Sequence, residues 1–177
     1  MTSFIILFRG VGGATQLPTK PLREVLTEAG FGNVRTYINS GNAVLTSDKK
    51  AEEVERKIAV LTAKHFDFTK EIFVISSKDF DRMVEKNPFR EETKEPTKLH
   101  LFVLKTEPEQ AAIAALKGKV TETENLHIDA HALYFHTPKG FSDSKLGPKI
   151  DRILGVAITA RNWNSVLKLQ SMAHEAS

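Results

Sequence analysis

Hydrophobic positions in the first half of the chain change period repeatedly, from strand-like to helical and back. Phe4–Phe8 is an apolar run in which both alternating sets of side chains are apolar, which predicts a strand covered on both faces. Apolar residues at helical spacing follow between Leu22 and Ala29. The remaining elements of this half are expected at Val34–Ile38 and Ala43–Thr46 (strands), from Ala51 to His65 (helix) and at Glu71–Ile75 (strand). This order, βαββαβ, is the ferredoxin-like split unit.

The second half repeats most of that order. Strands are expected at Leu99–Leu104, Asn125–Asp129 and Ala132–His136, with helices near 106–118 and 148–154. A reduced last strand at Val156–Ile158, or the final helix from Arg161 to Met172, completes the half. The sequence therefore predicts an α+β fold of two tandem ferredoxin-like (βαββαβ-type) halves with antiparallel sheets and a C-terminal helix. Element order alone supports the duplication, and a single α+β domain is the alternative.

Residues 1–76 form the first predicted half and residues 97–177, with the C-terminal helix, the second. Between them, residues 77–96 read as a short helix followed by a charged linker, Glu91–Pro96. A capping box, Ser76-x-x-Asp79, marks the start of the short helix, and Thr106-x-x-Glu109 is a second such pattern.

Composition narrows the classes of function without selecting one. The 177 residues carry a formal net charge of +3 and no cysteine, which excludes disulfides, thiol nucleophiles and cysteine-bound metals. No apolar run approaches the roughly 20 residues that span a bilayer, and the N-terminus lacks the basic segment of a signal peptide. We expect a cytoplasmic protein with no membrane partner.

The first candidate site is the glycine-rich loop that follows the first strand. Arg9, Gly10, Gly12 and Gly13 lie between a strand and a helix, where successive backbone N–H groups can form an anion-binding nest. The Walker A and dinucleotide patterns both fail, because Thr15 stands where each requires glycine. A simple turn is the alternative.

The second candidate site is the polar run between the next two strands. Asn39-Ser40-Gly41-Asn42 is also ordinary hairpin material. In a βαββαβ sheet, however, this end of the third strand lies beside the end of the first. The side chains of Tyr37, Asn39, Ser40 and Asn42 are therefore expected at the same sheet edge as the Arg9 loop.

A third candidate segment opens the last predicted helix. Arg161 could bind an anion or a carboxylate, and Asn162 and Asn164 suit a first helical turn. The structural alternative is a capped helix with Trp163 packed beneath it.

Neither a metal nor a cofactor is expected. His127, Asp129, His131 and His136 gather in one predicted hairpin, but their spacing matches no standard zinc signature. An RNA-recognition module would need aromatic side chains on its central strands. Phe102, Tyr134 and His136 offer only a thin platform of that kind.

Five short motifs together resemble the DUF1697 family of bacterial proteins, across nearly the whole chain. They are Arg9–Gly13, Thr36–Asn42, Asn87-Pro88-Phe89, Phe141–Gly147 and Ala160–Asn164. The resemblance implies a small α+β protein of two ferredoxin-like halves, and it brings no activity or binding residues with it. The family pattern R-G-I-N-V-G-G is two residues longer than Arg9-Gly10-Val11-Gly12-Gly13, so the first loop is shortened here.

The leading hypothesis from the sequence is a binding protein for a small anionic or nucleotide-like ligand. Nucleic-acid binding through the basic surface is one alternative. An enzyme that uses a serine, histidine or lysine is another. A dimerisation module, expected as a homodimer, is the last.

Overall fold

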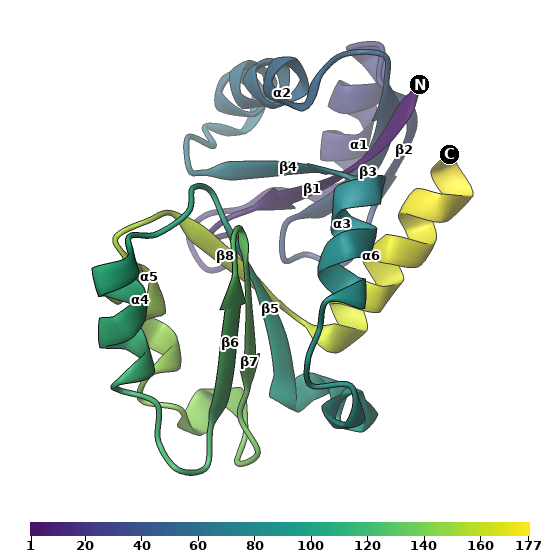
Figure 1. Cartoon of the computed structure of the whole chain (residues 1–177). Coiled ribbons are helices and arrows are strands. Elements are labelled where there is room, and N and C mark those ends of the chain that lie inside the picture. The colour runs from purple at the N-terminus through teal and green to yellow at the C-terminus, as the bar shows by residue number, and fades with distance from the viewer. The chain divides into compact units, whose positions relative to one another are not determined.

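The chain, described over residues 1–177 by a computed structural model, folds into two compact units. The first comprises Met1–Arg82 with Leu167–Ser177, and the second comprises Met83–Val166. Each unit holds one four-stranded antiparallel sheet with β-α-β-β-α-β connectivity (Figure 1). The predicted α+β class with two antiparallel sheets and a C-terminal helix is confirmed at this level. None of the helices combines the length and apolar composition that crossing a bilayer requires.

The first sheet has the strand order β2-β3-β1-β4. Its core lies between one face of the sheet and two helices, where side chains from β1 and β3 meet Leu22, Leu26 and Ile58. The elements are β1 (Thr2–Phe8), α1 (Thr19–Glu28), β2 (Gly32–Thr36), β3 (Asn42–Ser47), α2 (Ala51–Phe66) and β4 (Ile72–Ser76).

Both faces of β1 are covered, as its doubly apolar sequence predicts. Ile5 and Leu7, on the face opposite the helical core, are 0% and 1% exposed. On that face the Ser3 hydroxyl donates to the carbonyl oxygen of Ala173 (2.9 Å), which lies in α6 (Trp163–Ala176).

The last eleven residues thus belong to the first unit, whereas the sequence interpretation assigned them to the second half. Gln170 and His174 of α6 both donate to the carboxylate of Asp81 in α3 (Ser77–Glu85), at 2.7 and 2.9 Å. Partial burial would raise the pKa of Asp81, but these two hydrogen bonds bring it below its usual value.

The second sheet has the strand order β6-β7-β5-β8. Two helices lie side by side on one of its faces (Figure 1) and supply Leu116, Ile150 and Leu154 to a core shared with Phe102 and Phe135. The elements are β5 (Leu99–Leu104), α4 (Gln110–Lys117), β6 (Asn125–Asp129), β7 (Ala132–His136), α5 (Ile150–Leu154) and β8 (Ile158–Asn162).

Two expectations about the ends of the second half were wrong. The last strand is neither reduced nor replaced, because β8 pairs along Ile158–Asn162 with β5. Arg161 and Asn162 end this strand, and the helix begins at Trp163 instead of Arg161. The charged segment that the sequence indicated as a linker contains short 3-10 turns at Glu91–Lys94 and Pro96–Lys98.

Of the two predicted capping boxes only the first forms. The Ser76 hydroxyl donates to the Asp79 carboxylate (2.7 Å) and accepts the Asp79 amide (3.1 Å) at the start of α3. The Thr106 pattern was wrong, because the N-cap of α4 is Glu109, with no side-chain capping bond.

Candidate functional site

The two glycine-containing loops of the first unit meet at one sheet edge, as the sequence analysis expected. Leu7 lies opposite Asn42 in the antiparallel register of β1 and β3. One residue further along, the Phe8 amide donates to the carbonyl oxygen of Gly41 (2.9 Å). The Arg9 loop and the Tyr37–Asn42 hairpin are therefore neighbours.

The Arg9 loop is closed on itself. Gly12 and Thr15 exchange two backbone hydrogen bonds of 2.7 and 3.0 Å. Lys70 donates to the carbonyl oxygen of Gly10 (3.1 Å) and to the Thr15 hydroxyl (2.9 Å). Gly10, Gly12 and Gly13 all have positive φ, which explains why the tight turn uses glycine. These contacts give the loop a structural role of its own.

The polar run of the hairpin is also used internally. The side-chain amide of Asn42, which is 1% exposed, donates to the carbonyl oxygen of Tyr37 (3.1 Å) and to the Ser40 hydroxyl (2.9 Å). The amide of Tyr37 donates to the carbonyl oxygen of Asn42 (3.1 Å). The turn alternative thus accounts for Asn42 and Ser40, while Asn39 lies on the exposed part of the turn.

Tyr37 lines a cavity of about 350 Å³ in the first unit, together with Arg23, Arg35, Lys168 and Glu175. Two of its cations are already engaged. Arg35 pairs with Glu175 at 2.6 Å and holds the pKa of that carboxyl below its usual value. Arg23 donates to the hydroxyl of Thr36 (3.1 Å). The cavity thus holds one carboxylate, which is paired with Arg35, beside two further cations, Arg23 and Lys168.

The third predicted segment lies in the second unit. Arg161 is largely buried, which lowers its pKa to about 10, and it donates to the Thr159 hydroxyl and the Ala160 carbonyl oxygen, both at 2.8 Å. The Asn162 carboxamide oxygen accepts the Ser165 amide (3.1 Å), so Asn162 caps α6. Asn164 is exposed on the first turn of α6. Arg161 and Asn162 therefore serve the junction between β8 and α6.

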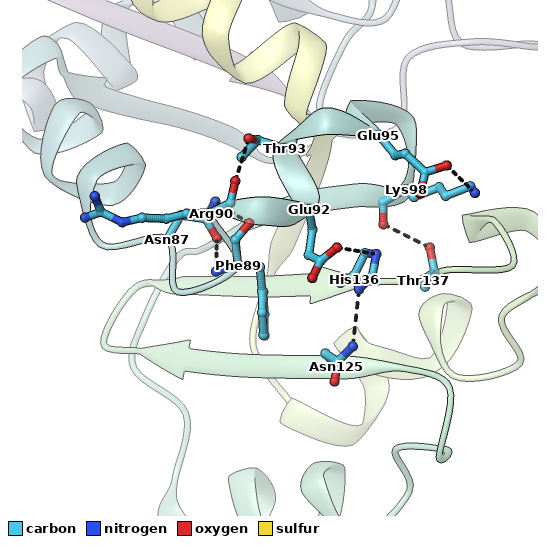
Figure 2. A network of polar contacts seen from close by, with 10 residues as sticks. All are labelled: Asn87, Phe89, Arg90, Glu92, Thr93, Glu95, Lys98, Asn125, His136 and Thr137. Carbon is cyan, nitrogen blue, oxygen red and sulfur yellow. Dashed lines mark hydrogen bonds and ion pairs between the residues drawn. The ribbon is translucent and has the colours of Figure 1, made fainter.

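A polar network joins the Asn87-Pro88-Phe89 motif to the end of β7 (Figure 2). The Asn87 side chain accepts the Phe89 amide (2.9 Å), and the Phe89 ring lies 6.4 Å from the ring of His136. His136 is buried at 5% exposure, and its Nδ1 accepts a hydrogen bond from Asn125 (3.2 Å). Its Nε2 lies 3.8 Å from the Glu92 carboxylate. The motif therefore fastens the loop after α3 onto the second sheet.

The histidine-rich hairpin does not assemble a metal site. No group of three or more His, Asp or Glu side chains in the chain is close enough to hold a metal ion. His131 Nδ1 instead contacts the carbonyl oxygen of Leu104 (3.2 Å), and the ring of His127 stacks on Tyr134.

The aromatic side chains considered for RNA stacking are not on an open surface. Phe102, Tyr134 and His136 are 3%, 0% and 5% exposed. The Tyr134 hydroxyl donates to the carbonyl oxygen of Met83 (2.5 Å), and burial raises the pKa of this phenol above its usual value. Base stacking as in an RNA-recognition module has no exposed platform here.

The second unit carries a pocket that sequence analysis missed, here called the basic cleft. Its volume is about 320 Å³. It is lined by four cationic side chains and three others, namely Lys119, Lys145, Lys149, Arg152, Thr121, Leu146 and Ile153. No carboxylate is among the lining residues. None of the four cations takes part in an ion pair.

A second pocket of about 470 Å³ adjoins the basic cleft and shares Thr121 and Lys145 with it. We call it the polar pocket. Hydroxyl and carboxylate side chains dominate its lining, and Lys139 adds a cation. The lining includes Thr123, Thr137, Ser144, Glu122, Glu124, Asp143 and Lys139. The Ser144 hydroxyl donates to Glu124 (2.7 Å) and accepts the amide of Gly147 (3.0 Å), which fixes the wall between the two pockets.

The sequence of the chain identifies its family. A family described as "Protein of unknown function (DUF1697)" matches residues 1–134. The chain belongs to the DUF1697 family. The resemblance inferred from the five motifs is thereby confirmed. No curated protein matches the chain.

A solved structure extends the similarity beyond the part matched by the DUF1697 family. The conserved bacterial protein SP0830 from Streptococcus pneumoniae is 23% identical, with a TM-score of 0.73 over 97% of this chain and 98% of that one. At this identity the likeness shows the fold. It includes the region after residue 134 where two of the five motifs of the DUF1697 resemblance lie.

The motifs of the DUF1697 family are mostly explained by turns, caps and the network around His136. The four cations of the basic cleft come from the end of α4 and from the segment around α5, and they are not part of a run of basic residues. Lys145 lies within the fourth family motif, Phe141–Gly147, but the sequence alone indicated no role for any of the four. The feature that marks the basic cleft is that its four cations have no acidic partners. Only the folded structure reveals this feature.

Proposed function

We propose that the chain binds a small anionic ligand in the basic cleft of the second unit. The observation that carries the proposal is the presence of four unpaired cationic side chains, Lys119, Lys145, Lys149 and Arg152, around one hollow. Like charges held close together repel, and a bound anion would relieve that repulsion. The sequence hypothesis of an anion-binding protein is therefore kept, with a different location for its ligand.

The form of the basic cleft suits a compact anion. Arg152 offers a planar guanidinium that can contact a phosphate or carboxylate through two hydrogen bonds. The three lysines add flexible point charges around it. Leu146 and Ile153 supply apolar lining, which lowers the local dielectric and strengthens each charge contact.

Calorimetric titration with inorganic phosphate tests this proposal. The double variant Lys149→Gln, Arg152→Gln should weaken phosphate binding at least tenfold. The control is Arg23→Gln, Lys168→Gln, which removes the same charge from the cavity beside Tyr37 in the first unit. This control should leave the affinity unchanged.

Two results would contradict the proposal. One is the absence of phosphate binding to the unsubstituted protein at low ionic strength. The other is an equal loss of affinity in both double variants, which would indicate the general positive charge of the surface. Loss of phosphate affinity in the control variant alone would favour a ligand site near Tyr37, at the sheet edge where the sequence predicted one.

We also propose that each unit is a ferredoxin-like domain, as expected from the sequence. The connectivity and the strand orders β4-β1-β3-β2 and β8-β5-β7-β6 support this description. An experimental structure with either order changed would contradict it.

The remaining sequence expectations stay predictions. Ligand contact at Arg9, Gly10, Gly12, Gly13, Asn39 or Ser40 would appear as NMR shift changes confined to that edge during titration with a ligand. The cytoplasmic location can be tested by cell fractionation. A homodimer would be detected by light scattering, and nucleic-acid binding by salt-sensitive retention on heparin.

A further inference from the structure

We infer that the ligand is a phosphorylated sugar or polyol, whose phosphate occupies the basic cleft and whose hydroxyl groups occupy the polar pocket. The inference rests on the proposed function and narrows it, because it selects a class among small anions. It depends on the difference in charged and hydrogen-bonding groups between the basic cleft and the adjoining polar pocket.

The two pockets adjoin and differ in the chemistry of their linings. They share Thr121 and Lys145, so a ligand held by the cations of the basic cleft can reach towards the polar pocket past these two residues. Volumes of about 320 and 470 Å³ lie within the range of roughly 300–1,000 Å³ that small-ligand sites occupy. The basic cleft has cations and no carboxylate, whereas the polar pocket combines three carboxylates and several hydroxyls with two lysines.

The acceptors of the polar pocket suit neutral hydroxyl groups. The side chains of Glu122 and Asp143 line this pocket and take part in no ion pair, so both carboxylates can accept hydrogen bonds. A pair of neighbouring hydroxyls donates well to one carboxylate. The three carboxylates of this pocket outnumber its two lysines, Lys139 and Lys145, so a second anionic group is less favoured here than in the basic cleft. The ligand should therefore carry its charge at one end only.

The lining also distinguishes a sugar phosphate from a nucleotide. Neither pocket has a phenylalanine, tyrosine or tryptophan among its lining residues. Nucleobases are usually held by stacking on aromatic rings, and such stacking contributes to the affinity for a base. Without such a ring, adding a base to a sugar phosphate should bring no gain in affinity.

Calorimetric titration of the full chain tests the inference. The four probes are inorganic phosphate, ribose, ribose 5-phosphate and AMP. Ribose 5-phosphate should bind at least tenfold more tightly than inorganic phosphate. AMP should bind no more tightly than ribose 5-phosphate, and ribose alone should bind at least a hundredfold more weakly. The variant Asp143→Asn, Glu122→Gln should reduce the advantage of ribose 5-phosphate to less than threefold and leave phosphate affinity within twofold or improve it.

The outcomes separate this inference from the proposed function. Equal affinity for phosphate and ribose 5-phosphate would overturn the inference, although the anion site would stand. Tighter binding of AMP than of ribose 5-phosphate would also overturn it, in favour of a nucleotide. An unchanged advantage of ribose 5-phosphate in the double variant would refute the role of the polar pocket. No binding of any phosphate would refute both proposals.

Discussion

His100 shows how a single side chain can make stability depend on pH. It stacks on Phe141 with ring centroids 4.3 Å apart, and burial lowers its pKa to about 4 from 6.5. Its buried Nδ1 has no hydrogen-bond partner. The folded state therefore holds a neutral imidazole that the unfolded chain protonates near pH 6.5.

We predict that stability is lost as the pH falls from 6.5 towards 4, by up to roughly 3 kcal/mol from this residue. Above pH 6.5 His100 is neutral in both states and contributes no pH dependence. Urea unfolding across this range should give a shallower slope for His100→Phe, which keeps the stacked ring. His65→Gln, at an exposed position, should keep the original slope. Parallel curves for the unsubstituted protein and His100→Phe would refute the assignment.

Gly41 is required by the turn in two ways that can be separated. Its φ is +81°, and an added Cβ would lie 2.8 Å from the carbonyl oxygen of Phe8 and 2.7 Å from the Val11 side chain. We predict that Gly41→Ala lowers the free energy of unfolding by roughly 1–3 kcal/mol for the backbone strain plus a further amount for the clash. Gly13→Ala is the control, because Gly13 also has positive φ but open space around it. Similar thermal shifts for both variants would argue against the clash.

The polar run at residues 36–42 was visible in the sequence, but its meaning was not. Hairpin residues and site residues are the same types, since glycine, asparagine and serine serve both purposes. The hairpin interpretation and the site interpretation differ in the direction in which the side-chain amide of Asn42 points. The structure directs it to Tyr37 and Ser40 inside the turn.

At the level of elements, the capping box at the start of α3 offers a direct test. Ser76→Ala removes both hydrogen bonds to Asp79 and leaves the Asp79 amide without its partner. We predict a loss of about 1 kcal/mol in chemical unfolding. Ser142→Ala, at an exposed position in a 3-10 turn, should change stability far less. A Ser76→Ala variant as stable as the control would mean that solvent replaces the cap.

Strands with a clear pattern were predictable, including the bounds of three of them, whereas β8 was not. The strands Leu99–Leu104, Asn125–Asp129 and Ala132–His136 have the bounds that the alternation indicated. β8 was misjudged because its last residues, Arg161 and Asn162, are polar and precede a helix. Pairing with β5 extends the strand over them, and that pairing is a tertiary effect without a local signal.

At the scale of the whole molecule, the first unit is built from both ends of the chain. Residues 167–177 supply the partners of Ser3, Asn33, Arg35 and Asp81. We predict that a fragment of residues 1–82 is unstable alone. The same fragment joined to residues 167–177 by a short Gly-Ser linker should unfold cooperatively by circular dichroism. Equal melting curves would show that the last eleven residues contribute little to this unit.

The repeated element order was readable from the sequence, whereas the basic cleft was not. The hydrophobic period and the turn residues are local features of the sequence, so they can be recognised without knowledge of the fold. Lys119, Lys145, Lys149 and Arg152 are separated by up to 33 positions in the chain and lie among other charged residues. Their common hollow and their lack of acidic partners arise only when α4 and α5 pack together.

The return of the C-terminal segment to the first unit has a consequence for synthesis of the protein. Translation proceeds at roughly 5–20 residues per second, so the stretch between residues 82 and 167 takes on the order of ten seconds. During that interval the nascent first unit lacks residues 167–177. The face of β1 that carries Ser3 has therefore not yet formed its contact with Ala173. A ribosome that stalls late, or a premature stop codon near the end, would release a nearly full-length product with this face incomplete. Such a product would be a substrate for chaperones and proteases.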